Sequence, residues 1–246
     1  MFSKLRVQKY GGSSLDSIEK IKSIASQIAN DYSKGDRFLL VVSAMGKTTD
    51  ELTSLAQKIT TTPIHRELDM LLTAGERISM ALMSLALNDL GVPAISFTGS
   101  QAGIMTCGNH GDAAILEVKP TRVIEELKKD KIIVLAGFQG VDPTTKDVTT
   151  LGRGGSDTTA VSMAAYFNCS QCEFKKDTEG VFDIDPNTQP QATHRPEVSW
   201  DEIIALTKAG APFMHYKAAI LAKEKGIPLE ISHAHKPLGR RTLVKG

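Results

Sequence analysis

The sequence predicts an α/β fold, a three-layer αβα sandwich whose central sheet is mainly parallel and carries helices on both faces. Strand-like and helix-like segments alternate along its 246 residues. Two strand-like segments, residues 38–42 and 132–136, are continuous apolar runs, which is typical of parallel strands buried on both faces. Glycine-bearing turns follow Tyr10, Val42 and Ala136. Because ligands of such sheets bind where the strands end, these turns predict the position of a ligand site.

The first half of the chain alternates most regularly. Apolar residues at helical spacing begin at Ile18, and a long helical pattern stops where Gly91 and Pro93 follow it. The predicted elements are, in order, a strand over residues 5–10, a helix from residue 18, a strand over 38–42, helices over 49–59 and 67–90, a strand over 94–97, a helix over 121–129 and a strand over 132–136.

The second half begins with a glycine-rich segment, Leu151–Val161, and we expect Ser156 or Asp157 to cap the helix that it opens. The loosest stretch is Asn187–Pro196, and the tail over residues 233–246 is expected to be a loop or a short edge strand. The other predicted elements are a strand over 171–175, helices over 199–207 and 216–225, and a strand over 228–231. We expect residues 1–246 to form one domain.

Composition excludes several classes of function. The 29 basic and 28 acidic residues leave a net charge of +1, which argues against a nucleic-acid-binding or membrane-surface protein. No signal peptide is recognisable over residues 1–10, and no apolar run approaches the ~20 residues of a membrane span. The 3 cysteines are an odd number, so a disulfide framework is not expected and a cytoplasmic location is. Cys169 and Cys172 are predicted to be buried apolar residues rather than half a zinc site or a redox pair.

The segment from Arg153 to Asp157 is the most informative part of the chain. Gly154 and Gly155 let the backbone approach a ligand, and a helix N-terminus attracts anions. Arg153 adds one positive charge and Asp157 one negative charge. A plain helix start would explain Ser156 and Asp157, but not the arginine and the two glycines beside them.

A second candidate for phosphate chemistry lies at the first strand. Lys9 ends this strand just before Gly11 and Gly12, where its charge suits a phosphoryl group. A solvated lysine before a turn explains it equally well. Gly46-Lys47-Thr48 matches the end of a P-loop, but the first glycine of that motif would fall at Val41, so we reject a P-loop.

Other polar residues are candidates for binding a small substrate. The hydroxyls of Ser43, Thr48 and Thr49 suit an anion. Glu76 beside Gly75 suits a substrate ammonium, although alone it is better explained as a solvated helix residue. The acidic turn that contains Asp177 and Asp185 could reach a ribose hydroxyl or a metal, or it could be a solvated loop. Two more glycine turns, over residues 97–103 and 135–140, favour one shared cleft.

Taken in order, these segments resemble the aspartokinase family of the amino acid kinase superfamily. The resemblance covers nearly the whole chain and implies the fold of that superfamily. It implies an amino-acid-binding half over about 1–160, a nucleotide-binding half over about 161–246, and phosphoryl transfer from ATP to the side-chain carboxylate of L-aspartate, the first step of aspartate-family amino acid biosynthesis. The matching segments are Lys9–Ser14, Ser43–Asp50, Gly75–Arg77, Thr98–Gly103, Ala136–Gly140 and Leu151–Ala160.

The resemblance also implies a role for each matching residue. Lys9 would neutralise charge on the transferred phosphoryl group, and Asp157 would orient that lysine and the metal–nucleotide group. Arg153 would bind the α-carboxylate of aspartate and Glu76 its α-ammonium. No direct metal ligand is expected, because Mg2+ enters with ATP. The other substrate-binding residues would be Ser43, Thr48 and Ser156, and the nucleotide-binding residues would be Gly11, Gly12, Gly154, Gly155, Lys176, Asp177, Phe182 and Asp185.

The nucleotide side departs from the family pattern. Lys175 and Lys176 stand where the family has Tyr-Thr, Asn187 stands for an arginine, and Pro212 stands for a common lysine. We hypothesise that Lys175 or Lys176 supplies the lost charge. The alternatives are a related kinase for another acceptor and a regulatory protein whose activity has decayed.

The length is a second departure. Most family members continue into regulatory ACT domains, and this chain stops about where those would begin. We therefore expect no ACT domain and no feedback inhibition by an amino acid from this chain alone. A homodimer or a separate regulatory subunit is left open as the partner.

Overall fold

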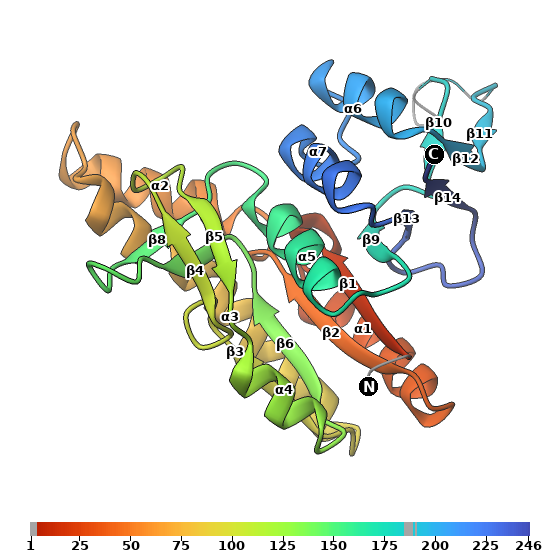
Figure 1. The fold of residues 1–246 in the computed structure, drawn as a ribbon, viewed down its shortest axis with the longest axis horizontal. Coiled ribbons are helices and arrows are strands. Elements are labelled where there is room, and N and C mark those ends of the chain that lie inside the picture. Colours follow the sequence, from red (N-terminus) through yellow and green to blue (C-terminus); the bar gives the residue numbers. More distant parts are fainter. Residues whose placement is uncertain (1–3, 185–188, 190) are drawn as a thin grey trace.

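The computed structural model describes residues 4–184, 189 and 191–246. Asp185 and Asn187, two residues of the predicted nucleotide loop, lie outside the described residues. The main sheet has the strand order β12-β14-β13-β9-β1-β2-β6-β3 (Figure 1). Its strands are β1 (Leu5–Tyr10), β2 (Arg37–Val42), β3 (Ala94–Phe97), β6 (Ile132–Ala136), β9 (Cys172–Lys176), β12 (Glu197–Val198), β13 (Leu229–His233) and β14 (Arg241–Val244).

Five neighbouring pairs of this sheet, from β13 across to β3, are parallel, which confirms the predicted α/β class. The two faces of β2 show why. Leu39 and Val41 belong to one core cluster, and Leu40 and Val42 belong to the other, so a continuous apolar run is needed to fill both.

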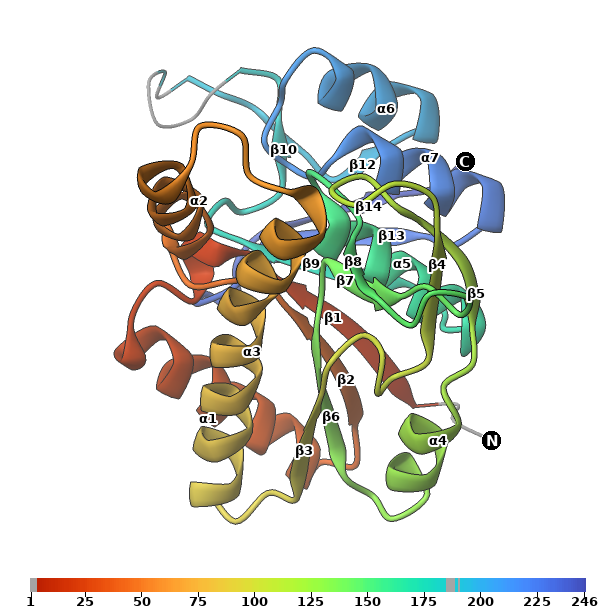
Figure 2. The same ribbon diagram turned by 90° about the vertical axis from the view of Figure 1, so that its left-hand side faces the viewer.

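Helices cover both faces of the sheet, as predicted (Figure 2). One face packs against α1 (Ile18–Ser33) and α3 (His65–Asp89), and α2 (Thr48–Ile59) packs on α3. The opposite face packs against α4 (Thr121–Leu127), α5 (Gly155–Tyr166), α6 (Trp200–Lys208) and α7 (Tyr216–Lys225). The three-layer prediction is confirmed.

The prediction for the start of α5 was wrong. The helix begins at Gly155, and its N-cap residue is Gly154, which has a left-handed φ of 77°. A Cβ at Gly154 would lie 2.0 Å from Cβ of His215, so only glycine fits against that residue. Ser156 and Asp157 therefore lie inside the first turn. The Asp157 side chain does not cap the helix and is free to make other contacts.

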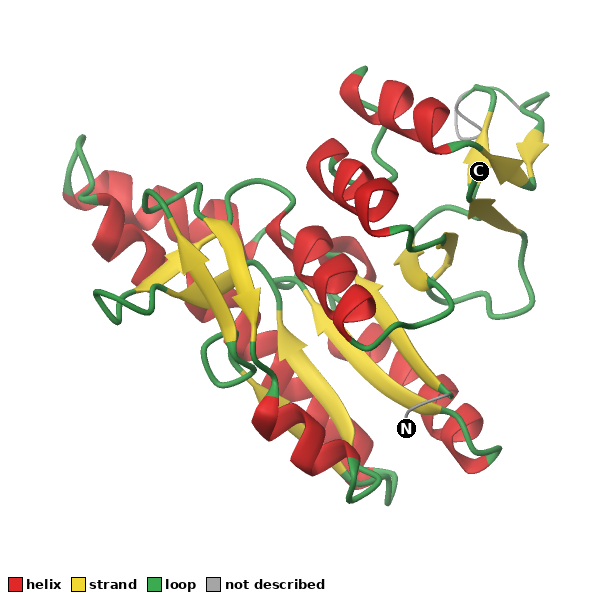
Figure 3. Cartoon of the chain, in the orientation of Figure 1, coloured by secondary structure: helices red, strands yellow, loops and turns green. Residues whose placement is uncertain are grey.

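A second sheet was missed by the sequence analysis. It has the order β5-β4-β7-β8 and consists of β4 (Ile104–Cys107), β5 (Ala114–Val118), β7 (Gln139–Val141) and β8 (Val148–Thr150) (Figure 3). These strands are short, and inside the sheet the hydroxyls of Thr106 and Thr149 pair at 2.6 Å. In β4 and β8 these buried positions are polar threonines, so no apolar alternation marks the two strands.

The chain beyond α5 also differs in detail from the prediction. The tail forms β14, which lies between β13 and the two-residue edge strand β12 and is therefore not an edge strand itself. A small antiparallel pair, β10 (Val181–Phe182) and β11 (His194–Arg195), was not predicted. Cys169 and Cys172 are buried and free, as expected.

The 25 residues of α3 have the length and hydropathy of a membrane-spanning helix, contrary to the expectation that no apolar run approaches that length. It packs against β2, β3 and β6 and buries Met83 and Leu87 completely. The apolar residues of that face are thus part of the core between α1, α3 and the sheet.

Candidate functional site

The predicted glycine turns meet in one cavity at the carboxyl ends of β1, β2 and β6. Backbone bonds hold the turns together: Ser43 N donates to Tyr10 O (3.1 Å), Gly46 N to Gly12 O (3.0 Å) and Gly137 N to Val42 O (3.0 Å). The cavity has a volume of about 290 Å3, which suits a small ligand. It is lined by Lys9, Gly12, Ser43, Ala44, Gly46, Thr49, Glu76, Phe138, Gly152, Arg153, Gly154, Ser156 and Asp157.

A buried ion pair lines this cavity. Lys9 Nζ at the end of β1 lies 2.7 Å from Asp157 Oδ1 in the first turn of α5, and both side chains are more than nine-tenths buried. The second oxygen, Asp157 Oδ2, accepts a hydrogen bond of 2.9 Å from the backbone N–H of His215. Burial opposes ionisation of Asp157, but the charges of Lys9 and Lys176 hold its pKa below the ordinary value. Asp157 is therefore ionised, and its contact with Lys9 Nζ keeps that lysine oriented in the cavity.

Glu76 enters the cavity from the middle of α3. Its Oε1 accepts a hydrogen bond of 3.2 Å from the backbone N–H of Ala44, while Oε2 is buried and has no partner among the described residues. Burial raises the pKa of Glu76 to about 7, although the Ala44 bond and the charge of Lys9 oppose this. A buried, unpartnered carboxylate oxygen is costly unless a ligand supplies a donor. Glu76 thus has the chemistry to bind a cation.

Arg153 lines the same cavity from the loop between β8 and α5. Its neighbours Gly152 and Gly154 have φ angles of 70° and 77°. The side chain is exposed and has no ion-pair partner in the described part of the chain. One cavity therefore holds an unpaired guanidinium and an unpaired carboxylate, which together match a zwitterionic ligand.

The structure sorts the predicted small residues into two groups. Ser43, Ser156, Gly12 and Gly154 lie in the cavity wall. The other three lie behind it: Thr48 packs its methyl group near Gly75, Gly155 packs between Leu151 and Phe138, and Gly11 is near Lys9 without lining the cavity. Thr49, which the sequence analysis also named as a hydroxyl donor, lines the cavity, whereas Thr48 does not.

Four lining residues were not predicted as site residues: Ala44, Gly46, Phe138 and Gly152. Phe138 follows the glycine turn after β6 and has a φ of 71°, which is unusual for a residue with a side chain. The turn glycine was the only sequence signal nearby, and it could not show that the next residue bends into the cavity.

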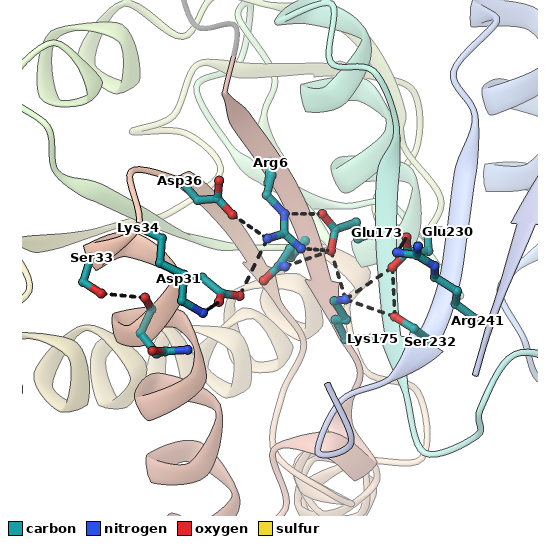
Figure 4. Close-up of polar contacts among 12 residues, drawn as sticks. Arg6, Asp31, Ser33, Lys34, Asp36, Glu173, Lys175, Glu230, Ser232 and Arg241 are labelled. Atoms are coloured by element: carbon teal, nitrogen blue, oxygen red, sulfur yellow. Dashed lines mark hydrogen bonds and ion pairs between the residues drawn. The ribbon is translucent and has the colours of Figure 1, made fainter. Parts of the chain in front are cut away.

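The two adjacent lysines of β9 lie on opposite faces of the sheet, because successive side chains of a strand alternate. Figure 4 shows Lys175 in a polar network on the face covered by α1. Lys175 Nζ lies 2.9 Å from Glu173 Oε2 and 3.0 Å from Ser232 Oγ, and Arg6 Nε lies 2.6 Å from Glu173 Oε1. Burial opposes ionisation of Glu173, but its bonds with Arg6 and the charge of Lys175 lower its pKa to about 2. Lys175 is thus fully engaged away from the cavity.

Lys176 does not line the cavity but lies near Lys9 and Asp157, on the face opposite Lys175. Burial and the nearby charge of Lys9 lower the pKa of Lys176 to about 8, against the attraction of Asp157 and Asp177. Asp177 is exposed just beyond it, and the ring of Phe182 contacts the ring of His194 at 5.4 Å between centroids. Asp185 lies outside the described residues. Of the two lysines that the sequence offered, the structure brings only Lys176 towards Lys9 and Asp157.

Metal ligands do not cluster in the described part of the chain: no group of three or more His, Cys, Asp or Glu residues could hold an ion by itself. Asp157 is nevertheless a carboxylate at the cavity, and a magnesium ion that stays bound to phosphates and water needs only one or two carboxylates.

Comparison with known proteins decides the family. Residues 4–233 match the sequence model of the amino acid kinase family. The chain belongs to the amino acid kinase family. This agrees with the ion pair and the glycine turns of the cavity, and it confirms the resemblance that the sequence motifs carry.

Several relatives of this amino acid kinase are named aspartokinases. The aspartokinase of Mycolicibacterium smegmatis is 46% identical over 98% of this chain, and this chain spans 57% of its length. The crystal structure of aspartate kinase from Synechocystis superposes with a TM-score of 0.84 at 41% identity, covering 98% of this chain and 40% of that one. The fold also matches that of Escherichia coli aspartokinase III, solved with aspartate and ADP, with a TM-score of 0.84 at 22% identity, covering 98% of this chain and 64% of that one.

Proposed function

We propose that this chain transfers the γ-phosphoryl group of ATP to the side-chain carboxylate of L-aspartate and so forms 4-phospho-L-aspartate. The observation that carries the proposal is the single cavity in which unpaired Glu76 and Arg153 stand beside the Lys9–Asp157 pair. The names of relatives at 46% and 41% identity support the same activity. The proposal includes a division near residue 160 into an amino-acid-binding half and a nucleotide-binding half.

In this proposal aspartate binds through three separate charges. Its α-ammonium donates to Glu76 Oε2, and its α-carboxylate pairs with Arg153, which can bind it with two parallel hydrogen bonds. Its side-chain carboxylate then lies towards Lys9, where Ser43, Thr49 and Ser156 provide hydroxyl donors. A neutral amino acid would lack the third charge and would leave these donors unpaired.

ATP would occupy the other side of Lys9. The phosphates lie at the N-terminus of the 12-residue helix α5, where free backbone N–H groups and the helix dipole favour anions. Gly12 and Gly154 allow close approach, and Lys176 adds a positive charge. Asp177, Phe182 and Asp185 are proposed to contact the rest of the nucleotide. Bound Mg2+ supplies further charge neutralisation at the phosphates, with Asp157 as the carboxylate in reach.

The chemistry needs no general base. At neutral pH the aspartate side chain is already ionised, so one of its oxygens attacks the γ-phosphorus directly. The new oxygen–phosphorus bond forms as the bond to the β-phosphate oxygen breaks, and the electron pair leaves with ADP. Lys9 stabilises the charge on the equatorial oxygens, while Asp157 keeps that lysine in place.

An ATP-dependent hydroxamate assay over a panel of carboxylic amino acids tests the proposal. We expect product with aspartate and none with glutamate or asparagine. Product with another acceptor only would indicate a related kinase. No product with any acceptor, from protein that binds ATP, would indicate a regulatory protein without activity.

The cellular setting forms part of the same proposal. The free cysteines, of which Cys169 and Cys172 are buried and Cys107 is exposed, agree with a reducing cytoplasm. The chain is proposed to act as a homodimer or with a separate regulatory subunit, and light scattering of the purified protein alone and with candidate subunits distinguishes the two.

A further inference from the structure

A buried carboxylate outside the cavity joins three segments that are far apart in the sequence. Asp69 on α3 is 1% exposed. Its Oδ1 accepts from the Thr150 hydroxyl at 2.6 Å. Its Oδ2 accepts from the Thr150 backbone N–H at 3.1 Å, from the Gly111 N–H at 3.2 Å and from His110 Nδ1 at 2.8 Å. Both oxygens therefore accept hydrogen bonds within the chain, and the buried side chain of Asp69 is not open to a ligand.

The position of Asp69 relates it to the substrate side of the cavity. Asp69 and Glu76 are seven residues apart on α3, which is two turns, so they lie on the same helix face about 10 Å apart. Thr150 ends β8 and stands three residues before Arg153. One carboxylate thus connects the helix that carries Glu76 to the strand that leads into Arg153.

The second connection, through Gly111, supports the same loop from behind. A Cβ at Gly152 would lie 2.7 Å from Asp112 Oδ1 and 3.0 Å from Gly111 O, so the 108–112 loop is packed directly against the residue before Arg153. Gly152 and Gly154 on either side of Arg153 have left-handed φ angles. Arg153 has no ion-pair partner of its own among the described residues, so its position depends on the segments that flank it.

We propose that Asp69 is a positioning residue that sets the distance between Arg153 and Glu76, and so the fit of the α-carboxylate and α-ammonium of the amino acid substrate. The inference rests on the proposed function. A stability role alone is a poor explanation, because a buried carboxylate costs desolvation energy that an apolar contact in the same place would avoid. What the carboxylate adds is direction: four donors, from one strand end and one loop, converge on two oxygens.

The test is Asp69→Asn, which keeps the shape but replaces one accepting oxygen with an amide donor. Arg153 then shifts relative to Glu76, and we expect KM for aspartate to rise roughly 10- to 100-fold, as for other small displacements of binding groups. KM for ATP is expected to stay within about twofold of the unmodified protein, since Lys9 and Lys176 are held by other segments. The variant is expected to fold, because Gln139 Nε2 still donates to Thr73 O and ties α3 to the second sheet.

Two further variants separate positioning from stability. Leu87→Ala removes a fully buried side chain of the same helix, far from the cavity, and should lower Tm while leaving KM for aspartate unchanged. Thr150→Val removes only the hydroxyl that donates a hydrogen bond to Asp69 Oδ1. We expect KM for aspartate to rise about threefold or more. The two effects on KM should not multiply in Asp69→Asn/Thr150→Val, because both variants remove the same hydrogen bond.

The outcomes separate this inference from the proposed function. An unmodified protein that does not phosphorylate aspartate would refute the proposed function, and with it the role of Asp69 in that site. An active protein whose aspartate KM is unchanged in Asp69→Asn would refute the positioning role alone. Equal rises in KM for aspartate and ATP, or a rise of the same size in Leu87→Ala, would also refute it. Should Asp69→Asn not fold, Thr150→Val decides the question by the same criteria.

Discussion

The face of the central sheet under α1 and the cavity at the strand ends both hold charged groups, but these groups differ in how far they are paired. On the face under α1, Arg6, Glu173 and Lys175 satisfy one another (Figure 4). At the carboxyl ends of β1, β2 and β6, the cavity contains one carboxylate oxygen of Glu76 and the guanidinium of Arg153 without partners in the described residues. The first cluster is complete without a ligand and the second is not. Saturation, rather than burial of charge as such, distinguishes the structural network from the candidate site.

The largest expected effect is a loss of kcat when the buried ion pair between Lys9 and Asp157 is broken. Lys9→Met keeps most of the side-chain volume and removes the charge beside the transferred phosphoryl group. We expect kcat to fall roughly 100- to 1,000-fold, which is typical when one donor to a transition-state charge is lost. Steady-state kinetics with aspartate and ATP measure it. A variant that retains more than a third of the activity would show that Lys9 is part of a structural pair only.

The next effect tests the unpaired guanidinium. Arg153→Ala should lower kcat/KM for aspartate by roughly 100-fold, as expected for the loss of a charged contact of ~3 kcal/mol. ATP affinity should change little, because Arg153 is assigned to the amino acid. Calorimetric titration with ATP is the control, and an equal loss of ATP affinity would contradict the assignment.

A smaller effect is expected on ATP affinity, where the adjacent residues Lys175 and Lys176 can be compared directly. Lys176→Ala removes a charge near Asp157, and we expect ATP affinity to fall about tenfold, since hydrogen bonds to charged groups contribute ~1.5 kcal/mol or more. Lys175→Ala is the matched control one residue away: it should lower Tm by breaking the bonds with Glu173 and Ser232 while leaving ATP affinity unchanged. The hypothesis that a β9 lysine compensates for the altered nucleotide loop fails if neither variant changes ATP affinity.

The smallest effect is a dependence of kcat/KM for aspartate on pH, which arises from the titration of Glu76. Because burial raises its pKa to about 7, Glu76 is ionised above that pH and protonated below it. Only the ionised form attracts the substrate ammonium, so kcat/KM for aspartate should reach half its maximum at about pH 7 and fall further towards acid pH. The Glu76→Gln variant should be less active and should lose this acid limb. An unchanged limb in that variant would assign the titration to another group.

Much of this arrangement could be predicted from the sequence. The apolar runs that became β2 and β6 are local signals, because a strand buried on both faces needs every residue to be apolar. The glycine turns after β1, β2 and β6 marked where the cavity lies. Lys9, Glu76, Arg153 and Asp157 were all named from motifs, and the structure places all of them in one cavity.

Other features depend on contacts between segments that are distant in sequence. The bonds of Asp69 join α3 to residues 41 and 81 positions away, and no local pattern reports them. The start of α5 at Gly155 depends on His215, which packs against Gly154 and excludes a side chain there.

By itself, the sequence determined six strands of the main sheet (β1, β2, β3, β6, β9 and β13), the glycine turns and the residue types of the site, because these follow from periodicity and from the needs of single residues. Only the tertiary structure decided which of Lys175 and Lys176 lies near Lys9 and Asp157, and whether Thr48 or Thr49 lines the cavity. Alternation along β9 guarantees that the two lysines point to opposite faces. Which of the two lies near Asp157 is set by the packing of α5, whose first turn carries Asp157, on the face opposite α1.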